Sequence, residues 1–233
     1  MTTEIIMNKN KKIGIILISV VVILVFVAVL SSDKPSLPIE SENLSIEIPI
    51  EYSNDAEFSS NSPIIGSSEA PVTILSFSDY QCIGCKTWYE NEFPEISDKL
   101  IQTGKANIIF LDSVLAGSDS SRISQASFCA NEQGKYQEYQ KILFRSQQDV
   151  DTWAKPPQLI EFASDLELDL NSFESCLDSG KYEKDVQSNV SYSQSLGVDQ
   201  IPIFKVINYE GREHILKGGL SSIIFENVVN RFQ

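Results

Sequence analysis

A pair of cysteines separated by two residues, Cys82 and Cys85, constrains the fold of this chain more than any other feature. The pair follows a strand-like apolar run at residues 72–77 and directly precedes a segment with helical spacing of apolar residues. Two thiols at this spacing can form and open a disulfide, and the positive end of a helix dipole lowers the pKa of the first thiol. The pattern therefore predicts a strand, a loop and a helix that carries an exposed, reactive first thiol at its N-terminus, and it indicates thiol–disulfide exchange.

The spacing of the remaining cysteines argues against a zinc site. A tetrathiolate site needs a second close pair, whereas Cys129 and Cys176 are far apart in the sequence. No metal is therefore expected. An inert structural disulfide between Cys82 and Cys85 stays open as an alternative to a reactive one.

Three states are open to Cys129 and Cys176. We expect a second, structural disulfide between them, within a helical region of the chain. Two buried reduced thiols that pack as small hydrophobic side chains are an alternative, and an electron relay to the first pair is another. His214 is the only histidine and lies in a predicted strand, so a Cys-His hydrolase has little support.

The charge balance excludes two classes of partner. The net charge of −14 disfavours binding to nucleic acid or to anionic lipid, because both carry negative charge themselves. A hydrophobic content of 42% is ample for the core of one enlarged domain.

The N-terminus predicts a membrane anchor. Residues 13–30 are uncharged and mostly apolar, and as a helix they would be about 27 Å long, close to the thickness of a hydrocarbon core. Lys9, Lys11 and Lys12 precede this run, which predicts a cytoplasmic tail at residues 1–12 and a single-pass anchor in the cell membrane. A cleaved signal peptide is the alternative, and both place the following domain outside the cytoplasm.

The rest of the chain divides into a linker and one domain. Residues 31–61 are rich in Ser, Pro and Glu and predict a linker, and residues 62–233 predict the domain. Pro94 is expected to kink or split the helix that follows Cys85. We expect strands at 72–77, 106–111, 203–207 and 214–217, a helical insertion at about 119–196 and a last helix at about 221–232. This order predicts an α/β fold of the thioredoxin type with an inserted helical subdomain.

Three separate motifs make the domain resemble the DsbA-like family of thiol–disulfide oxidoreductases. The first is APVTI at residues 70–74, followed by FSDYQC at residues 77–82 and the second cysteine of the pair. The second is CANEQGKY at residues 129–136, inside the helical insertion, and the third is GVDQIPIF at residues 197–204. The resemblance covers residues 62–233, and the order of the three motifs makes it specific.

The resemblance implies roles for particular residues. Cys82 would be the attacking thiol that forms a mixed disulfide with a substrate, and Cys85 would resolve it. Pro202 would follow a cis peptide bond beside the cysteines, and the backbone of Ile201 would pair with an extended substrate. No cofactor is implied, because the thiol pair is itself the redox group.

Two positions depart from the pattern of the family. Strongly oxidising members usually have proline directly after the first cysteine, where this chain has Ile83, followed by Gly84. Neither side chain can donate a hydrogen bond to the Cys82 thiolate, so backbone N–H groups and the helix dipole must stabilise it. A buried acid is also common in the family six residues before the first cysteine, where this chain has Ser76; Asp79 is nearer.

These features lead to two functional hypotheses. The first is a membrane-tethered oxidoreductase that forms or rearranges disulfides in exported proteins with cysteines. A membrane redox partner of the DsbB type or the vitamin K epoxide reductase type would recycle it. The second is a non-catalytic chaperone or a binding module of an envelope complex, with a structural pair at Cys82 and Cys85.

Overall fold

The computed structural model describes residues 57–148 and 153–233 of the chain. The predicted tail at residues 1–12, the predicted anchor at residues 13–30 and most of the predicted linker lie outside the described residues. Among the helices in the described ranges, none has the length and apolar character needed to cross a membrane.

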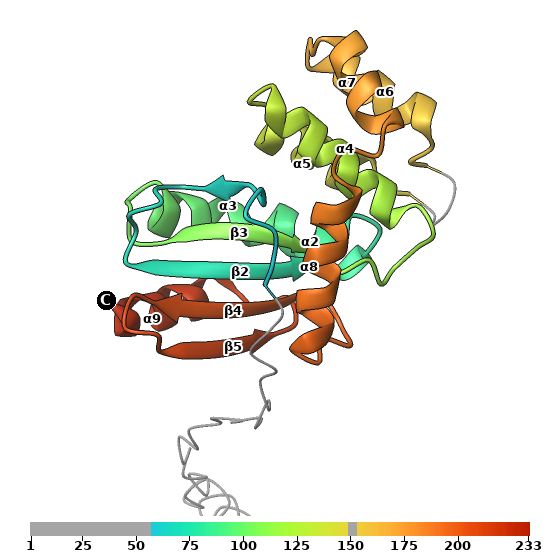
Figure 1. The fold of residues 1–233 in the computed structure, drawn as a ribbon. Coiled ribbons are helices and arrows are strands. Elements are labelled where there is room, and N and C mark those ends of the chain that lie inside the picture. The colour runs from blue at the N-terminus through green and yellow to red at the C-terminus, as the bar shows by residue number, and fades with distance from the viewer. Residues whose placement is uncertain (1–56, 149–152) are drawn as a thin grey trace, which may run out of the picture. The chain divides into compact units, whose positions relative to one another are not determined.

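The described part of the chain contains a mixed sheet with helices on both of its faces (Figure 1). Its five strands follow the order β1-β3-β2-β4-β5. Neighbours β2 and β3 run parallel, and the other neighbouring pairs are antiparallel. The four predicted strands are confirmed, and the two-residue strand β1 is an addition. The strands are β1 Ile64–Ile65, β2 Val72–Ser78, β3 Asn107–Asp112, β4 Ile203–Asn208 and β5 Glu213–Lys217.

Strand β2 carries apolar side chains on both of its sides because helices cover both faces of the sheet. Val72 and Ile74 belong to the larger apolar core on one face, and Leu75 and Phe77 belong to a smaller core on the other. Figure 1 shows α8 crossing one face of the sheet, with α2, α3 and α9 on the opposite side. The helices are α2 Ile83–Asn91, α3 Phe93–Ile96, α4 Ser120–Glu132, α5 Tyr136–Ser146, α6 Pro156–Asp165, α7 Leu170–Asp178, α8 Glu183–Ser195 and α9 Ser222–Phe232.

The helical insertion is confirmed between β3 and β4. It begins with α4 at Ser120 and ends with α8 at Ser195, close to the predicted limits of 119 and 196. The split at Pro94 is confirmed as well. Helix α2 ends at Asn91, Pro94 lies in the first turn of α3, and a π-helical turn at Ser97–Ile101 follows. Proline at this position fits a helix start, because its missing N–H group would have no helical partner there.

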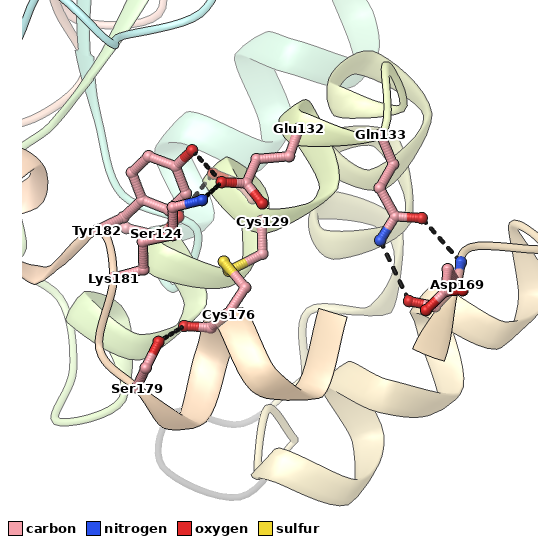
Figure 2. Close-up of a disulfide and its surroundings, with 10 residues drawn as sticks. Ser124, Cys129, Glu132, Gln133, Asp169, Cys176, Ser179, Lys181 and Tyr182 are labelled. Carbon is pink, nitrogen blue, oxygen red and sulfur yellow. Dashed lines mark hydrogen bonds and ion pairs between the residues drawn. A yellow bond between two sulfur atoms is a disulfide. The ribbon is translucent and has the colours of Figure 1, made fainter. Parts of the chain in front are cut away.

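A disulfide joins Cys129 of α4 to Cys176 of α7 (Figure 2). Of the three states that the sequence left open, the structure therefore has the disulfide. Two further contacts hold the ends of α7 against α4. Gln133 exchanges two hydrogen bonds with the backbone of Asp169, at 2.7 and 3.2 Å. Beyond the other end of α7, the Glu132 carboxylate accepts hydrogen bonds from Lys181 and Tyr182.

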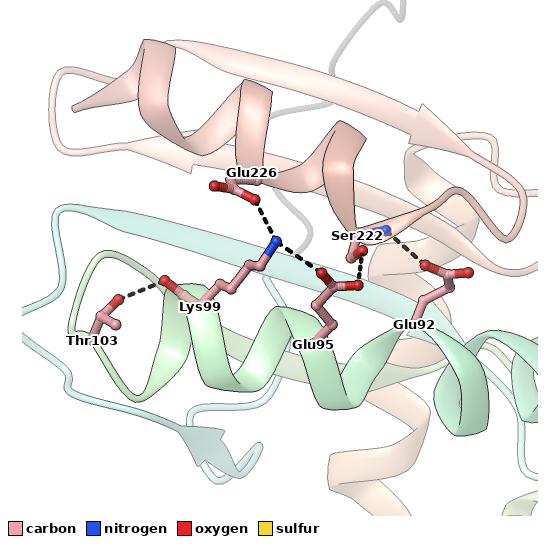
Figure 3. Close-up of polar contacts among 6 residues, drawn as sticks. All are labelled: Glu92, Glu95, Lys99, Thr103, Ser222 and Glu226. Atoms are coloured by element: carbon pink, nitrogen blue, oxygen red, sulfur yellow. Dashed lines mark hydrogen bonds and ion pairs between the residues drawn. The ribbon is translucent and has the colours of Figure 1, made fainter.

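The last helix is fixed to the segment that follows α2 by a group of charged side chains (Figure 3). The Glu92 carboxylate accepts a hydrogen bond from the backbone N–H of Ser222, 2.8 Å away, in the first turn of α9. The Ser222 hydroxyl donates to Glu95 at 2.6 Å. Lys99 pairs with Glu95 at 2.8 Å and with Glu226 of α9 at 3.1 Å. A carboxylate at a helix N-terminus is stabilising, because it satisfies a free N–H group and opposes the helix dipole.

The first described residues pack on α8. The rings of Phe58 and Tyr192 lie 5.4 Å apart, and the Ser59 backbone N–H donates to Asn189 at 3.0 Å. Asn189 in turn donates to Asp112 at the end of β3, at 3.2 Å. Phe58 and Ser59, at the end of the predicted linker, therefore pack against α8.

Candidate active site

Cys82 is the N-cap residue of α2. Strand β2 ends at Ser78, and a tight turn leads from it into the helix. Within this turn the Cys82 N–H donates a hydrogen bond to the Asp79 carbonyl at 3.1 Å. The backbone of Cys82 is extended, with φ −85° and ψ 118°, as is usual for an N-cap residue. Its carbonyl accepts the first helical hydrogen bond, from Lys86 N at 3.0 Å. The thiol therefore faces the free N–H groups of the first helical turn.

The Cys82 thiol is partly buried, yet it ionises more readily than an ordinary cysteine thiol. Its Sγ accepts a hydrogen bond from the backbone N–H of Cys85 at 3.3 Å. A hydrogen bond from the Cys85 side chain, followed by the backbone N–H groups of Cys85 and Gly84, outweighs burial and lowers the pKa of Cys82 to about 7. The sequence predicted the backbone donors but missed the Cys85 thiol as the strongest one.

Cys85 lies one helical turn deeper and is 1% exposed. Burial raises the pKa of the Cys85 thiol far above its ordinary value, and its hydrogen bond to Cys82 raises it further. Both cysteines are free thiols. The two sulfurs are therefore chemically unequal, with one accessible and acidic and the other buried and protonated.

Pro202 lies beside this pair, although 119 residues separate Cys82 from Ile201 in the sequence. The Ile201–Pro202 peptide bond is cis. The Ile201 carbonyl oxygen is 3.8 Å from Cys82 Sγ. A Cβ atom placed on Gly84 would lie 3.6 Å from Pro202 Cδ and 3.7 Å from Cys82 Sγ, so the proline ring lies close to the first turn of α2 and to the Cys82 sulfur. The structure brings together the four residues that the sequence proposed for the site.

The two candidate positions for a buried acid differ in their surroundings. Ser76 is fully buried, and its hydroxyl has no hydrogen-bond partner among the described residues. Asp79 is also buried, and its carboxylate accepts three backbone N–H bonds, from Gln81 at 2.8 Å, Leu115 at 2.9 Å and Ala116 at 2.8 Å. The Asp79 charge raises the pKa of both Cys82 and Cys85, so it opposes the thiolate.

Two exposed apolar residues belong to the segments around the thiol pair. Ile83 directly follows Cys82 and is 71% exposed. Leu115 lies in the loop after β3 that contacts Asp79, and it is 47% exposed. Our sequence reasoning missed Leu115, because no local motif in the loop marks it and only the tertiary contact to Asp79 places it here.

Other chemistry has little support in the described residues. They contain no group of three or more His, Cys, Asp or Glu side chains that could hold a metal ion. His214 lies on β5 opposite Val206, and burial lowers its pKa. Trp88 packs in the core against Phe204 and Phe225 rather than lining a binding surface.

The sequence and the fold are similar to those of known thioredoxin-family proteins. The sequence model of the thioredoxin family matches residues 59–224. Disulfide bond formation protein D of Bacillus subtilis is 25% identical over 148 residues, which are 62% of this chain and 67% of that protein. The probable disulfide bond formation protein D of Bacillus anthracis is 23% identical over 143 residues, 59% of this chain and 66% of that protein. The chain thus matches about two thirds of the length of these relatives.

Solved structures share the fold at low sequence identity. BdbD from Bacillus subtilis, in its oxidised form, superposes with a TM-score of 0.66 at 21% identity and covers 74% of this chain and 92% of its own. DsbA from Chlamydia trachomatis gives a TM-score of 0.64 at 21% identity, over 75% of this chain and 93% of its own. The match to the family model shows that the chain belongs to the thioredoxin family, and its fold resembles that of DsbA structures.

Proposed function

We propose that this protein is a membrane-tethered thiol–disulfide oxidoreductase that forms or rearranges disulfides in exported proteins. The observation that carries the proposal is the inequality of the two thiols at the start of α2. Cys82 is accessible and has a pKa of about 7, while Cys85 is buried beneath it. A thiolate that is populated near neutral pH is both a good nucleophile and a good leaving group.

The proposed reaction is a dithiol–disulfide exchange between protein and substrate. When Cys82 and Cys85 are joined, a substrate thiolate attacks the Cys82 sulfur, and the bond to Cys85 breaks with its electron pair on Cys85. A second substrate thiolate then attacks the substrate sulfur of the mixed disulfide and expels the Cys82 thiolate. The substrate loses two electrons and two protons and gains a disulfide, and the protein gains both as two thiols.

The backbone at Ile201 provides the edge along which a substrate would lie. Its carbonyl oxygen is 3.8 Å from the sulfur that reacts. An extended chain that pairs with this edge would place its own cysteine against Cys82, as in other cases of strand addition. We assign Ile201 and Pro202 to substrate binding on this basis.

The anchor and the redox partner are part of the proposal and rest on the sequence. The apolar run at residues 13–30 follows three lysines, which is typical of an anchor with a cytoplasmic N-terminus. The domain at residues 62–233 would then work outside the cytoplasm, where disulfides persist. A membrane redox protein of the DsbB type or the vitamin K epoxide reductase type would reoxidise Cys82 and Cys85.

Equilibration with glutathione buffers tests the proposal. The wild-type domain should exchange with glutathione through Cys82, and the equilibrium constant gives the reduction potential of the Cys82–Cys85 pair. Replacement Cys82→Ser should abolish exchange, while Cys85→Ser should trap a mixed disulfide at Cys82. The same potential decides whether the protein acts as an oxidase, an isomerase or a reductase.

A non-catalytic binding module is the second candidate. The exposed apolar side chains of Ile83 and Leu115 favour it, because such groups can also hold an unfolded chain without chemistry. This candidate predicts a very low potential and no exchange with glutathione. An exchanging Cys82 rules it out.

A further inference from the structure

The loop that follows β3 holds an unusual backbone conformation. Val114 has φ +37°, in the left-handed region that β-branched residues rarely adopt. Such a conformation costs free energy and persists only where surrounding contacts impose it. Strained residues of this kind gather at binding and catalytic sites, so the contacts that hold Val114 indicate what the loop is for.

Hydrogen bonds hold this loop on both sides of Val114. Before it, the Ser113 backbone N–H donates to the Ser78 carbonyl at 3.0 Å, and the Ser113 hydroxyl is 2.9 Å from that of Ser193. After it, the N–H groups of Leu115 and Ala116 both donate to one oxygen of Asp79, at 2.9 and 2.8 Å. Asp79 is 3% exposed, and its buried carboxylate accepts a third backbone hydrogen bond from Gln81.

Close packing fixes the next residue of the loop. A Cβ atom on Gly117 would lie within 2.8 Å of three atoms of the Gln81 side chain, the nearest at 2.3 Å, so only glycine fits there without a shift. Gln81 is itself buried, and its amide oxygen accepts from the Ser120 hydroxyl at 2.8 Å. The loop is therefore held against Asp79 and Gln81, in the turn that leads to Cys82.

All these contacts are made by the backbone and the small residues of the loop, and Leu115, whose backbone N–H binds the Asp79 carboxylate, stays 47% exposed. We infer that Leu115 is a specificity-determining residue, which contacts an apolar side chain next to the cysteine of a substrate polypeptide. Asp79 is the positioning residue, because its carboxylate holds the Leu115 backbone in place. This assignment rests on the proposed function of Cys82.

The occupant follows from chemistry and from the neighbouring site. Leu115 offers no hydrogen bond or charge, so it gains binding free energy only from apolar contact. A substrate held at the Ile201 edge with its cysteine at Cys82 would have the residues beside that cysteine close to the turn at residues 79–82, to which the Leu115 backbone is bonded. Ile83, which follows Cys82 and is 71% exposed, adds a second apolar contact for the same segment.

Two short peptides test the inference, each with one cysteine flanked on both sides by leucine in one case and by serine in the other. The measurement is the rate constant for reduction of the Cys82–Cys85 disulfide by each peptide and by glutathione. In the wild-type protein the leucine peptide should react about tenfold faster than the serine peptide, as the burial of one leucine side chain suggests. Leu115→Ser should remove most of this preference, measured as the ratio of the rate constants for the leucine and serine peptides.

The matched control is Ile64→Ser. Ile64 is 49% exposed, nearly the same as Leu115, but it lies on β1 at the edge of the sheet. This variant should keep the full preference for the leucine peptide. Equal preference in Leu115→Ser and in the wild-type protein would overturn the inference, as would a wild-type protein that shows no preference.

Asp79 is tested by a double-mutant cycle. Asp79→Asn should reduce the leucine preference, because an amide cannot accept all three N–H bonds of the carboxylate. If Asp79 acts through Leu115, the variant with both substitutions should lose no more preference than Leu115→Ser alone. If the loss of leucine preference in the double variant equals the product of the losses in the two single variants, the positioning role of Asp79 is contradicted. The ratio of the two peptide rates is used because the Asp79 charge also affects the pKa of Cys82.

The outcomes separate this inference from the proposed function. Failure of glutathione to react at Cys82 would refute the proposed function. Normal reaction with glutathione, together with no difference between the two peptides in any variant, would refute only the role of Leu115.

Discussion

Two sets of hydrogen-bond donors around Cys82 lower the pKa of its thiol, whereas burial raises it. The Cys85 thiol and the N–H groups of the first turn of α2 stabilise a negative charge on the Cys82 sulfur. Partial burial and the buried Asp79 carboxylate oppose that charge. The donors win, so the thiolate forms without a charged side chain from the residues between the two cysteines. Ile83 and Gly84 are therefore compatible with a reactive thiol.

The first prediction concerns the order in which the two thiols react. Alkylation of the reduced domain should label Cys82 before Cys85, with a rate that rises with pH through a midpoint near 7, the pKa of Cys82. Mass spectrometry of peptides after short exposure to iodoacetamide at several pH values gives both results. Cys82→Ser serves as the control and should show only slow labelling. Preferential labelling of Cys85 would contradict the assignment of roles.

Asp112 is a second residue with an unusual protonation equilibrium. It ends β3, is buried, and accepts hydrogen bonds from Asn189 and Ser124. Burial, helped by the Asp79 charge, raises the pKa of Asp112 from 3.8 to about 6. Tyr80 and Tyr136, whose pKa values the Asp112 charge raises, face the same region. Asp112 therefore lies where β3, α4 and α8 meet, with no cation to balance it among the partners described.

The second prediction is a dependence of stability on pH that Asp112 causes. Its pKa is higher in the folded state, so the folded protein binds the proton more tightly, and stability falls as pH rises from about 4 to about 6. The full effect is about 3 kcal/mol, from about two pKa units. Asp112→Asn should lack this fall, as measured by urea unfolding at pH 4 and pH 8. Asp165→Asn, at an exposed position of α6, makes the same charge change and should behave like the wild-type protein. Parallel pH profiles for all three proteins would count against the prediction.

At the scale of helices, the disulfide between Cys129 and Cys176 joins α4 to α7 across a separation of 47 residues. Closing a loop of this length stabilises the folded state by about 4 kcal/mol in the chain-entropy model. Contacts of Gln133 and Glu132 hold the same two segments, so the subdomain has support beyond the covalent bond.

The third prediction follows from this separation of roles. Replacement of both Cys129 and Cys176 with alanine should lower the free energy of unfolding by several kcal/mol, about the value for loop closure. Exchange with glutathione at Cys82 should stay near the wild-type rate, because the disulfide lies in the helical subdomain and the thiol pair at the start of α2. Urea unfolding and the exchange assay measure the two effects on one sample. A loss of exchange as large as that of Cys82→Ser would instead indicate an electron relay.

The elements of this fold differ in how well their sequences predict them. Strands β2 and β4 carry runs of apolar residues, and the pair at Cys82 and Cys85 marks the start of α2, so local pattern alone locates them. Strand β1 has only two residues, Ile64–Ile65, and depends on pairing with β3, which no local pattern reveals.

The candidate site divides in the same way. The cysteines and Pro202 were predictable from motifs, because their chemistry demands particular residue types at particular positions. The direction of the Asp79 carboxylate and the exposure of Leu115 were not, since both depend on a loop that lies 36 residues further along the chain. Contacts between residues so far apart in the sequence leave no local pattern, so only the tertiary structure reveals them.

For the whole chain, the charge and the predicted anchor act together. The net charge of −14 gives the chain as a whole no attraction to an anionic bilayer, so surface binding alone would not keep it at the membrane. A covalent tether would instead hold it at a high local concentration next to a membrane redox partner. The part of the predicted linker that precedes Phe58 has the composition of a flexible spacer, which would let the domain reach both partner and substrates.

The fourth prediction is that the chain is anchored once, with its N-terminus in the cytoplasm. Three lysines before residues 13–30 should retain the tail on the inner side, because translocation of basic residues is disfavoured. Protease treatment of intact cells should therefore remove the domain beyond the linker and spare an epitope placed at the N-terminus. A cytoplasmic marker protein that stays intact is the control for cell integrity. Release of soluble protein that begins near Ser31 would show a cleaved signal peptide instead, because an anchored chain keeps residues 13–30 attached to the domain.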